Sequence, residues 1–291
     1  MYIDDFFEKN KHIKKISRDS VSFSEFYNYW INMLAQRAMR LFKWSNTTVE
    51  PKEIETALAM NGHALVTEYN GSLAVFMGNM SGKPTIYYDE FESYAIHSPV
   101  FSKILTIKNN KDGVLISNNS LRNSLYPLFN HYAIMLAHIE TTYINTLING
   151  RDANGIPVVQ NEAQRQSVIA YRNNLCEGKV TAITDPAFLG VEFTANKAAT
   201  TININELQES RDNILNDFYS DLGVKTTWNK KGNMIREEVN GNDSMLLLNI
   251  SDMLTAREKA CEAVNAKYGT NWKVELSPEL QYTTEGGNND V

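Results

Sequence analysis

A run of hydrophobic residues between positions 121 and 149 constrains the fold of this chain more than any other feature. The apolar side chains recur every third or fourth residue over four heptads, at Leu121, Leu125, Leu128, Tyr132, Leu136, Ile139, Tyr143 and Leu147. This spacing places them on one face of an α-helix that would be about 43 Å long. Pro127 lies near its start, so the first turn can form a separate piece. Few compact domains of this size contain a helix of this length.

Five further helices are predicted from start and stop signals. A capping box, Ser22 with Glu25, opens an aromatic-rich amphipathic helix that we expect to extend to Lys43. A short helix follows Pro51 and stops before Gly62, and another covers 162–176. The last two helices are expected over 204–222 and 244–268, and each closes on a glycine, Gly223 and Gly269.

Short alternating segments predict a small antiparallel sheet. The clearest hairpin joins 63–69 to 72–78 through Asn70 and Gly71. The segment Ser81–Pro84 is expected to form a turn, and the remaining strands are expected at 85–91, 103–108, 113–117, 156–160, 180–184, 190–193 and 271–276. The sequence therefore predicts the α+β class, with long helices beside a small β domain.

The charges of the chain differ between its two ends. The net charge is -6, which argues against a protein that grips nucleic acid over most of its surface. Five cations and no acids lie between positions 9 and 18, at Lys9, Lys11, Lys14, Lys15 and Arg18. After Lys273 there is no cation, whereas Glu275, Glu279, Glu285 and Asp290 follow. Solvated tails without function are the alternative interpretation of these two runs.

Patterns that would indicate catalysis or a cofactor do not emerge from the sequence. The segment Gly78–Pro84 is one residue short of a phosphate-binding loop and carries proline where a hydroxyl is required. His131 and His138 lie seven residues apart without a third metal ligand, so we predict packing for them and neither metal nor cofactor for the chain. Cys176 and Cys261 form no paired cysteine motif. No apolar run is long enough for a membrane span, and the first residues of the chain are acidic. These features predict an intracellular protein that is not an enzyme.

Several short segments resemble a known family in the same order along the chain. They are Leu41–Trp44, Ser98–Phe101, Pro157–Val158, Asp221–Lys225, Asn229–Lys231, Met234–Val239 and Arg257–Glu262. Together they resemble the upper-collar protein, also called head-tail connector or portal, of small short-tailed bacteriophages. The resemblance extends from about Ser22 to Leu276, and it rests on the order of the segments because no single one is diagnostic.

The resemblance implies a ring-forming α+β fold in which long stem helices line a bundle and a small antiparallel β wing lies beside them. It assigns 1–21 to a basic arm and 22–120 to a first stem or wing helix with the β wing. It assigns 121–223 to the long stem helix, a β insert and a second stem helix, and 224–243 to a channel loop. The final segment, 244–291, then holds a long helix, a strand and an acidic tail on the crown side.

The resemblance also implies roles for individual residues. Channel contacts to DNA would come from Lys230, Lys231 and Arg236 in the loop and from Lys197. Of the two channel lysines typical of the family, one corresponds loosely to Lys197 and the other to Glu206. The arm cations Lys9, Lys11, Lys14, Lys15 and Arg18 would engage a packaging motor or a nucleic acid. Tyr132, Leu136 and Trp30 would lie at a subunit interface.

The implied partners are those of a virion component. They are further copies of the chain in a ring of twelve, double-stranded DNA, the capsid protein, a lower collar or tail protein, and a packaging motor with a packaging RNA. No membrane is expected, and the ring would be assembled in the host cytoplasm and reside at a capsid vertex. A nucleic-acid-processing enzyme such as a nuclease, or a tail adaptor ring, is the alternative.

Overall fold

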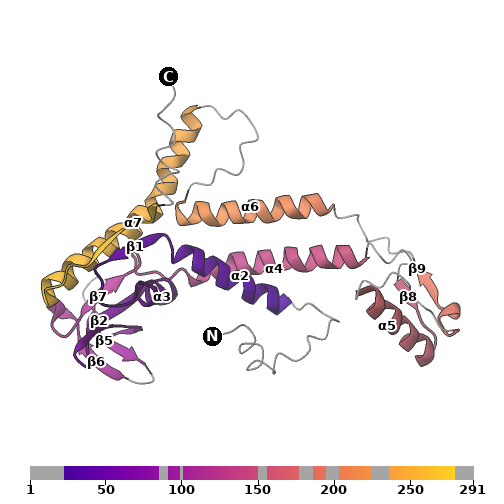
Figure 1. Cartoon of the computed structure of the whole chain (residues 1–291), viewed down its shortest axis with the longest axis horizontal. Coiled ribbons are helices and arrows are strands. Elements are labelled where there is room, and N and C mark those ends of the chain that lie inside the picture. Colours follow the sequence, from indigo (N-terminus) through magenta and orange to yellow (C-terminus); the bar gives the residue numbers. More distant parts are fainter. Residues whose placement is uncertain are drawn as a thin grey trace. The chain divides into compact units, whose positions relative to one another are not determined.

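The structure, a computed structural model, describes residues 23–84, 91–98, 101–149, 156–176, 186–194, 203–224 and 236–278. This part contains six α-helices and small antiparallel sheets, which confirms the predicted α+β class (Figure 1). The chain divides into a first unit, Met1–Trp30 with Ala133–Asn213, and a second unit, Ile31–Tyr132 with Ile214–Val291. The division falls within three helices, α2 (Phe23–Ala38), α4 (Tyr126–Asn149) and α6 (Ile204–Leu222).

The second unit contains two three-stranded antiparallel sheets. One has the order β3-β2-β7 and is built from β2 (His63–Tyr69), β3 (Ser72–Phe76) and β7 (Val114–Ser117). The other has the order β4-β5-β6 and is built from β4 (Gly78–Pro84), β5 (Phe91–His97) and β6 (Ser102–Thr106). The predicted hairpin turn is confirmed, because Asn70 and Gly71 adopt φ values of 50° and 80°. A short 3₁₀ turn, η1 (Lys108–Asn110), precedes β7.

The chain passes from the first sheet to the second at a sharp corner. Only Met77 separates the end of β3 from the start of β4. The next residue has to be a glycine, because a Cβ on Gly78 would lie 2.1 Å from the carbonyl oxygen of Ala95 on the neighbouring strand. The two sheets enclose a core of buried side chains, Leu65, Phe76, Tyr94, Ile96, Leu105 and Ile107.

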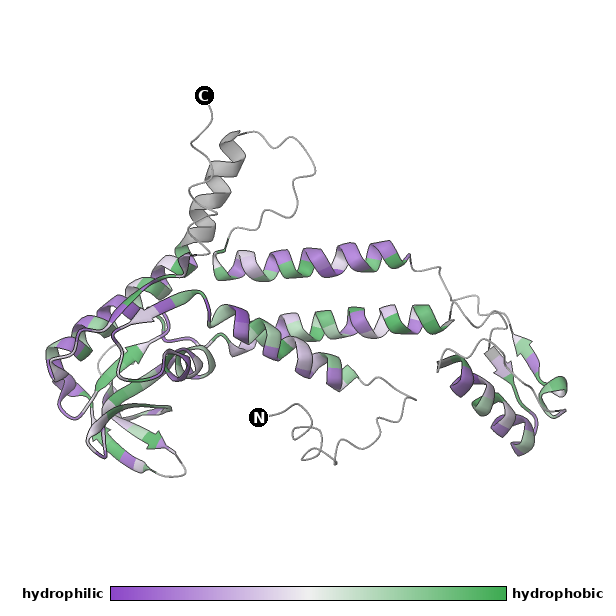
Figure 2. Cartoon of the chain, viewed as in Figure 1, coloured by the Kyte–Doolittle hydropathy of each residue, from purple (hydrophilic) through white to green (hydrophobic). Residues whose placement is uncertain are grey.

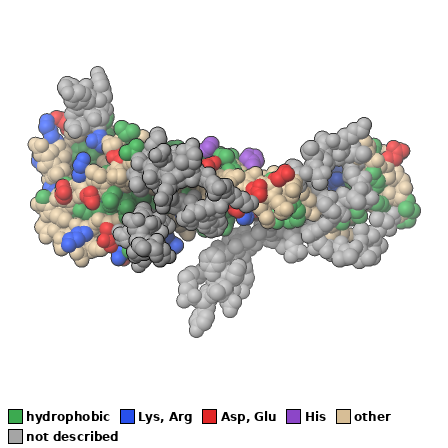
Figure 3. Space-filling view, turned by 90° about the horizontal axis from the view of Figure 1, so that it is seen from above, with side chains coloured by type: hydrophobic (Ala, Val, Ile, Leu, Met, Phe, Trp, Pro, Cys, Tyr) green, Lys and Arg blue, Asp and Glu red, His purple; other side chains and the backbone are tan. Residues whose placement is uncertain are grey.

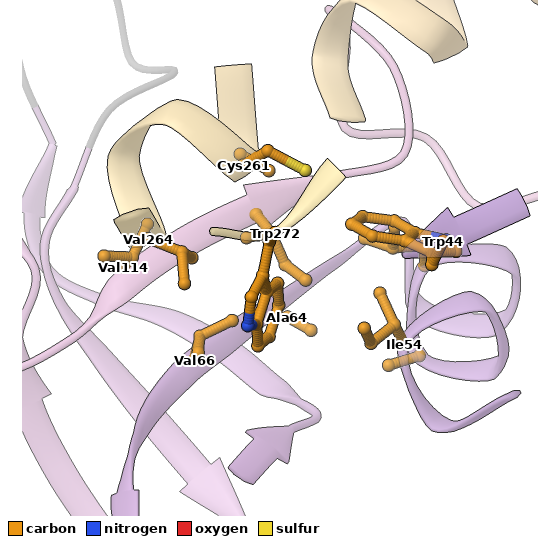
Figure 4. Close-up of a cluster of buried hydrophobic side chains, with 12 residues drawn as sticks. Trp44, Ile54, Ala64, Val66, Val114, Cys261, Val264 and Trp272 are labelled. Carbon is orange, nitrogen blue, oxygen red and sulfur yellow. The ribbon is translucent and has the colours of Figure 1, made fainter. Parts of the chain in front are cut away.

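A second core in the same unit joins elements from both ends of the sequence. Its residues come from α3 (Pro51–Asn61), α7 (Arg236–Tyr268), β1 (Phe42–Ser45), β10 (Lys273–Leu276) and the first sheet (Figure 4). The indole rings of Trp44 and Trp272 meet edge to face, with their centroids 6.3 Å apart. Cys261 is buried here as a free thiol, and burial, together with Glu258 and Glu262, raises its pKa to about 11. It therefore contributes to the core as a small hydrophobic side chain.

Arg257 of α7 is almost fully buried, and every hydrogen bond that it donates stays inside the second unit. Its Nε and Nη2 donate to the two carboxylate oxygens of Glu55, each at 2.8 Å. Nη1 donates to the backbone oxygens of Asn118 and Met253, and Nη2 also donates to the side chain of Asn118. The guanidinium lies 3.9 Å from the ring centroid of Phe42. One side chain thus ties α7 to α3, to β1 and to the turn after β7.

The N-terminal helix is shorter than predicted. It begins at Phe23, but it ends at Ala38 rather than Lys43. Residues 42–45 form β1 instead, which pairs with β10 so that Phe42 lies opposite Leu276 and Trp44 opposite Val274. The side chains of Phe42 and Trp44 are buried while Lys43 between them is exposed, which is the alternation of a strand. Pairing with a distant segment overrides the local helical spacing.

Other predicted boundaries shift by a few residues. The long helix starts at Tyr126 with Pro127 in its first turn, and Leu121 lies before it with 77% of its surface exposed. The segment Ser81–Pro84 belongs to β4 and contains a register irregularity, so the predicted turn is wrong. The strand expected at 85–91 falls mostly outside the described residues, and β5 begins at Phe91. The strand expected at 180–184 also lies outside them.

Three helix ends confirm the glycine caps. Gly62, Gly223 and Gly269 adopt φ values of 81°, 83° and 65°, and α3, α6 and α7 end immediately before them. The start of the last helix differs from the prediction, because α7 begins at Arg236 and not at Ser244. Helix α5 (Glu162–Cys176) has the predicted bounds.

The first unit contains a small α/β element between α4 and α6. Strands β8 (Ile156–Val158) and β9 (Glu192–Thr194) pair in antiparallel fashion beside α5 and η2 (Phe188–Gly190). The buried side chain of Gln164 accepts a hydrogen bond from the backbone of Gln160 at 2.7 Å and donates to the carbonyl of Gly190 at 3.0 Å. The aromatic rings of Tyr171, Phe188 and Phe193 pack in sequence beside it. Gln164 therefore joins the start of α5 to η2.

Replacing Arg257 by alanine should destabilise the second unit strongly. The Arg257→Ala variant leaves the buried carboxylate of Glu55 without its partner, and such a loss lowers the free energy of unfolding by about 3–5 kcal/mol. Urea denaturation followed by tryptophan fluorescence measures this value. The exposed Lys52→Ala on the same α3 is the control, with a change of about 0.5 kcal/mol or less. A loss below about 1 kcal/mol for Arg257→Ala would contradict the structural role of the pair.

A histidine between the two sheets should make the fold sensitive to acid. Nδ1 of His63 lies 3.2 Å from Oη of Tyr94 and 3.3 Å from Nδ2 of Asn61, which also donates to the carbonyl of Gly78. Burial, and secondarily the charge of Arg122, lowers the pKa of His63 below its ordinary 6.5. The unfolded chain then takes up the proton first, so stability is full above pH 6.5 and falls as the pH passes down through the folded-state pKa.

The His63→Gln variant tests this sensitivity. We expect the urea midpoint of the parent to drop between about pH 7.5 and about pH 5 and that of the variant to drop less. His97→Gln changes an exposed histidine of β5 and should leave the pH dependence as in the parent. Identical pH profiles for parent and His63→Gln would show that His63 does not cause the acid sensitivity.

Candidate functional site

Helix α4 carries one charged residue, Glu140, among its 24 residues. One face is buried in the chain and contains Phe129, Tyr132, Ala133, Leu136 and Ala137. The opposite stripe is exposed and contains His131, Ile134, His138 and Asn145. The hydroxyls of Thr141, Thr142 and Thr146 donate to carbonyl oxygens four residues earlier, so they are satisfied within the helix. The exposed stripe therefore presents a surface without aspartate, glutamate, lysine or arginine side chains.

The residues that were expected at a subunit interface lie inside a single chain. Trp30 and Tyr132 are each 6% exposed, and Leu136 is fully buried. Phe218 of α6 packs against the ring of Tyr132 with the centroids 5.6 Å apart. The spacing identified the apolar face of α4, but the chain's own side chains cover that face.

Helix α6 differs from α4 in charge. It contains five acidic residues, Glu206, Glu209, Asp212, Asp217 and Asp221, and one cation, Arg211. The Arg211 guanidinium lies 3.3 Å from the carboxylate of Asp212. Glu206, Glu209 and Asp217 are exposed, whereas Phe218 and Leu222 are buried. Figure 2 shows the contrast, because hydrophilic colours dominate α6 and hydrophobic ones are frequent in α4.

Within the first unit, α4 and α6 run beside each other. A small cavity of about 100 Å³ lies between Ile139, Glu140 and Tyr143 of α4 and Leu207, Gln208 and Arg211 of α6. Phe23 of α2 packs on the ring of His138, with a centroid distance of 4.6 Å. His138 is therefore engaged in packing, as its position without further metal ligands predicted.

The carboxyl end of α6 is fixed by two neighbouring helices. The phenol of Tyr132 donates a 2.6 Å hydrogen bond to the carboxylate of Asp221, and burial together with this carboxylate raises the tyrosine pKa. The side-chain amide of Asn249 on α7 donates to the carbonyl of Asp221 at 2.8 Å. The backbone N–H of Val224 closes the helix end by bonding the carbonyl of Tyr219. The chain thus leaves α6 at a fixed point immediately before residues 225–235.

The predicted cationic sites are only partly within the described residues. Lys197, Lys230 and Lys231 lie outside them, and so do the arm residues Lys9 to Arg18. Arg236 is the first residue of α7 and so belongs to a helix rather than to the predicted loop. The acidic residues of α6 were visible in the sequence as five acids within 19 residues, but only Glu206 was singled out.

The described surface shows neither a metal cluster nor a broad basic region. Among the described residues, no group of three or more histidine, cysteine or acidic side chains is placed to hold a metal ion. No helix in the same part of the chain has the length and apolar character to span a membrane. On the face seen in Figure 3, basic and acidic side chains are interspersed.

Comparisons with known proteins identify a family and similar solved structures. The sequence model of the family described as Phage Connector (GP10) matches residues 9–281. A solved structure described as the portal and tail of native bacteriophage P68 has a similar chain, with 16% sequence identity and a TM-score of 0.42. The similarity covers 99% of this chain and 96% of that one.

Proposed function

Since the chain belongs to the phage connector family, we propose that it forms a ring at one capsid vertex through which double-stranded DNA is packaged and ejected. A head-tail connector is a structural component of the virion, so no catalytic role is proposed. The ring would contain twelve copies, with the capsid protein and a lower collar or tail protein as neighbours. A packaging motor, with or without a packaging RNA, would be a further partner of the arm cations Lys9 to Arg18.

The unequal charge of α4 and α6 is the observation that carries this proposal. A ring subunit needs one surface that can be buried against the next copy and another that faces the passing DNA. The stripe of α4 around Ile134 contains no acid, lysine or arginine to desolvate on burial, so it suits the contact between copies. The acids of α6 suit a surface that repels phosphates and leaves DNA free to slide.

Rotational symmetry amplifies these charges. Five acids and one cation give α6 a net charge of -4, so twelve copies would carry on the order of 48 negative charges around the axis. Duplex DNA has about one negative charge per 1.7 Å, and a protein that neutralises many phosphates binds it tightly. We propose that only a few cationic positions, Lys197, Lys230, Lys231 and Arg236, touch the DNA within this repelling surface.

An acidic substitution on the exposed stripe of α4 should prevent ring formation. The Ile134→Asp variant places a charge where the proposal buries an apolar side chain against the next subunit. Because Ile134 is 37% exposed in the single chain, its folded state should lose about 1 kcal/mol or less. Native mass spectrometry should show monomers instead of rings.

The control for this experiment is Leu121→Asp. Leu121 lies outside α4 and is 77% exposed, so it is a similar change at a position that the proposal does not assign to the interface. This variant should assemble like the parent. Normal rings with Ile134→Asp would show that the stripe is not the contact between subunits.

Reversing the charge of α6 should hinder DNA passage without preventing assembly. The Glu206→Lys/Glu209→Lys variant changes two exposed acids, which in twelve copies replaces about 24 negative charges by as many positive ones. We expect rings with higher affinity for duplex DNA, a steeper salt dependence of binding, and slower filling of capsids. Binding titrations and a packaging assay measure these effects.

A matched control reverses two exposed acids of α7. Glu258→Lys/Glu262→Lys makes the same change in charge on a helix that the proposal does not assign to the tunnel at these positions. Its packaging should resemble that of the parent. Equal packaging rates for both variants would contradict the placement of α6 at the DNA.

A further inference from the structure

The second unit contains two asparagine–glycine pairs with very different surroundings. Asn61 ends α3 and Gly62 caps it, whereas Asn70 and Gly71 form the turn between β2 and β3. In this dipeptide the backbone nitrogen of the glycine can approach the side-chain amide of the asparagine closely, because glycine has no Cβ in the way. Since both pairs have the same two residue types, the fold decides which of them can react.

The fold engages both of the groups that would react at Asn61. Its Nδ2 donates a 2.9 Å hydrogen bond to the carbonyl oxygen of Gly78. The backbone N–H of Gly62 donates to the carbonyl oxygen of Leu58 at 2.9 Å, which closes the helix. Gly62 is buried, and a Cβ there would lie 2.1 Å from the carbonyl oxygen of Arg122. Attack by the Gly62 nitrogen therefore requires local unfolding first.

The turn at Asn70 leaves the corresponding groups open to solvent. Asn70 and Gly71 are exposed, and a Cβ on Gly71 would meet no atom of the described residues within 4 Å. Within that part of the chain, neither the Asn70 side chain nor the Gly71 N–H makes a hydrogen bond. The amide carbon of Asn70 and the nitrogen of Gly71 are therefore accessible while the hairpin stays folded.

We propose that Asn70, and not Asn61, is a site of spontaneous deamidation to aspartate and isoaspartate, because the turn leaves its reacting groups open. Hydroxide removes the proton of the Gly71 N–H, and the nitrogen attacks Cγ of Asn70. The N–Cγ bond forms, the Cγ–Nδ2 bond breaks, and ammonia leaves with a proton taken from water. The proposal concerns the single chain, so it does not depend on ring formation or on DNA.

Water then opens the resulting succinimide ring at either of its two carbonyl carbons. Breaking the bond from the Gly71 nitrogen to Cγ restores the normal backbone and leaves aspartate at position 70. Breaking the bond from the same nitrogen to the main-chain carbonyl carbon leaves isoaspartate, in which the backbone runs through Cβ and Cγ. Each product carries one negative charge more than asparagine.

The two products should affect the hairpin differently. Asn70 and Gly71 have positive φ values of 50° and 80°, and the flanking Tyr69 and Ser72 are paired. Aspartate keeps the length of this turn and, like asparagine, tolerates positive φ. Isoaspartate adds one chain atom to a two-residue turn whose geometry fixes the strand register. It should therefore weaken the pairing of β2 with β3.

Peptide mapping by mass spectrometry tests the proposal on the unsubstituted full-length chain. The folded protein is incubated in mildly alkaline buffer, and deamidation is followed separately at Asn61 and Asn70. We expect conversion at Asn70 to be at least about tenfold faster, because Asn61 reacts only from locally opened states. A smaller ratio, or faster conversion at Asn61, would overturn the proposal.

The unfolded chain is the matched control. In concentrated urea both asparagine–glycine pairs are exposed alike, so their rates should become similar. A ratio that persists in urea would show that the neighbouring sequence, and not the fold, sets the difference, and it would also overturn the proposal.

The effect on the hairpin is measured on the converted chains. Ion-exchange chromatography isolates the chains that have gained a negative charge, and mass spectrometry gives their isoaspartate content at position 70. Their urea midpoint should fall as this content rises. The Asn70→Asp variant reproduces the other product and should stay close to the parent. A midpoint independent of isoaspartate content would contradict the dependence of the hairpin on turn length.

Discussion

The second unit depends on a charge placed where water does not reach. Arg257 is 1% exposed, and the carboxylate that neutralises it belongs to Glu55, 202 residues earlier in the sequence. Two buried ions are costly to remove from water, so each tolerates the interior only while the other is present. The same guanidinium holds the turn at Asn118, and Trp44 donates a 2.7 Å hydrogen bond to Glu55. These contacts fix α3, α7, β1 and the turn after β7 as a single arrangement.

Further hydrogen bonds within the second unit join residues of the long helices. Tyr132 of α4 and Asn249 of α7 both donate to Asp221 near the end of α6, which sets the position from which the chain continues into residues 225–235. Such polar contacts hold helices in one orientation. Helices α4 and α6 differ in composition, because α4 contains one charged residue and α6 contains five acids and one cation.

The sequence predicted those elements whose determinants are local. The caps at Gly62, Gly223 and Gly269, the turn at Asn70 and Gly71, and the bounds of α5 follow from residues within a few positions of each other. Strand β1 was missed because its partner lies at the other end of the chain, and helical spacing continued into it. The buried face of α4 was recognised as apolar, but the residue that covers Tyr132 is Phe218 on another helix, which no local pattern reveals. The acidic character of α6 could have been predicted from the sequence alone, because it follows from the number of acidic residues in that helix.

The pairing of β1 with β10 has a consequence for the order in which the molecule is made. Phe42 is synthesised long before its partner Leu276. Until then β1 has no strand partner, and Glu55 has no arginine beside it. Contacts so distant in sequence are slow to form because a long loop must close first. The second unit therefore stays incomplete, with β1 unpaired and the Glu55 carboxylate without its arginine, until both Arg257 and β10 have been synthesised.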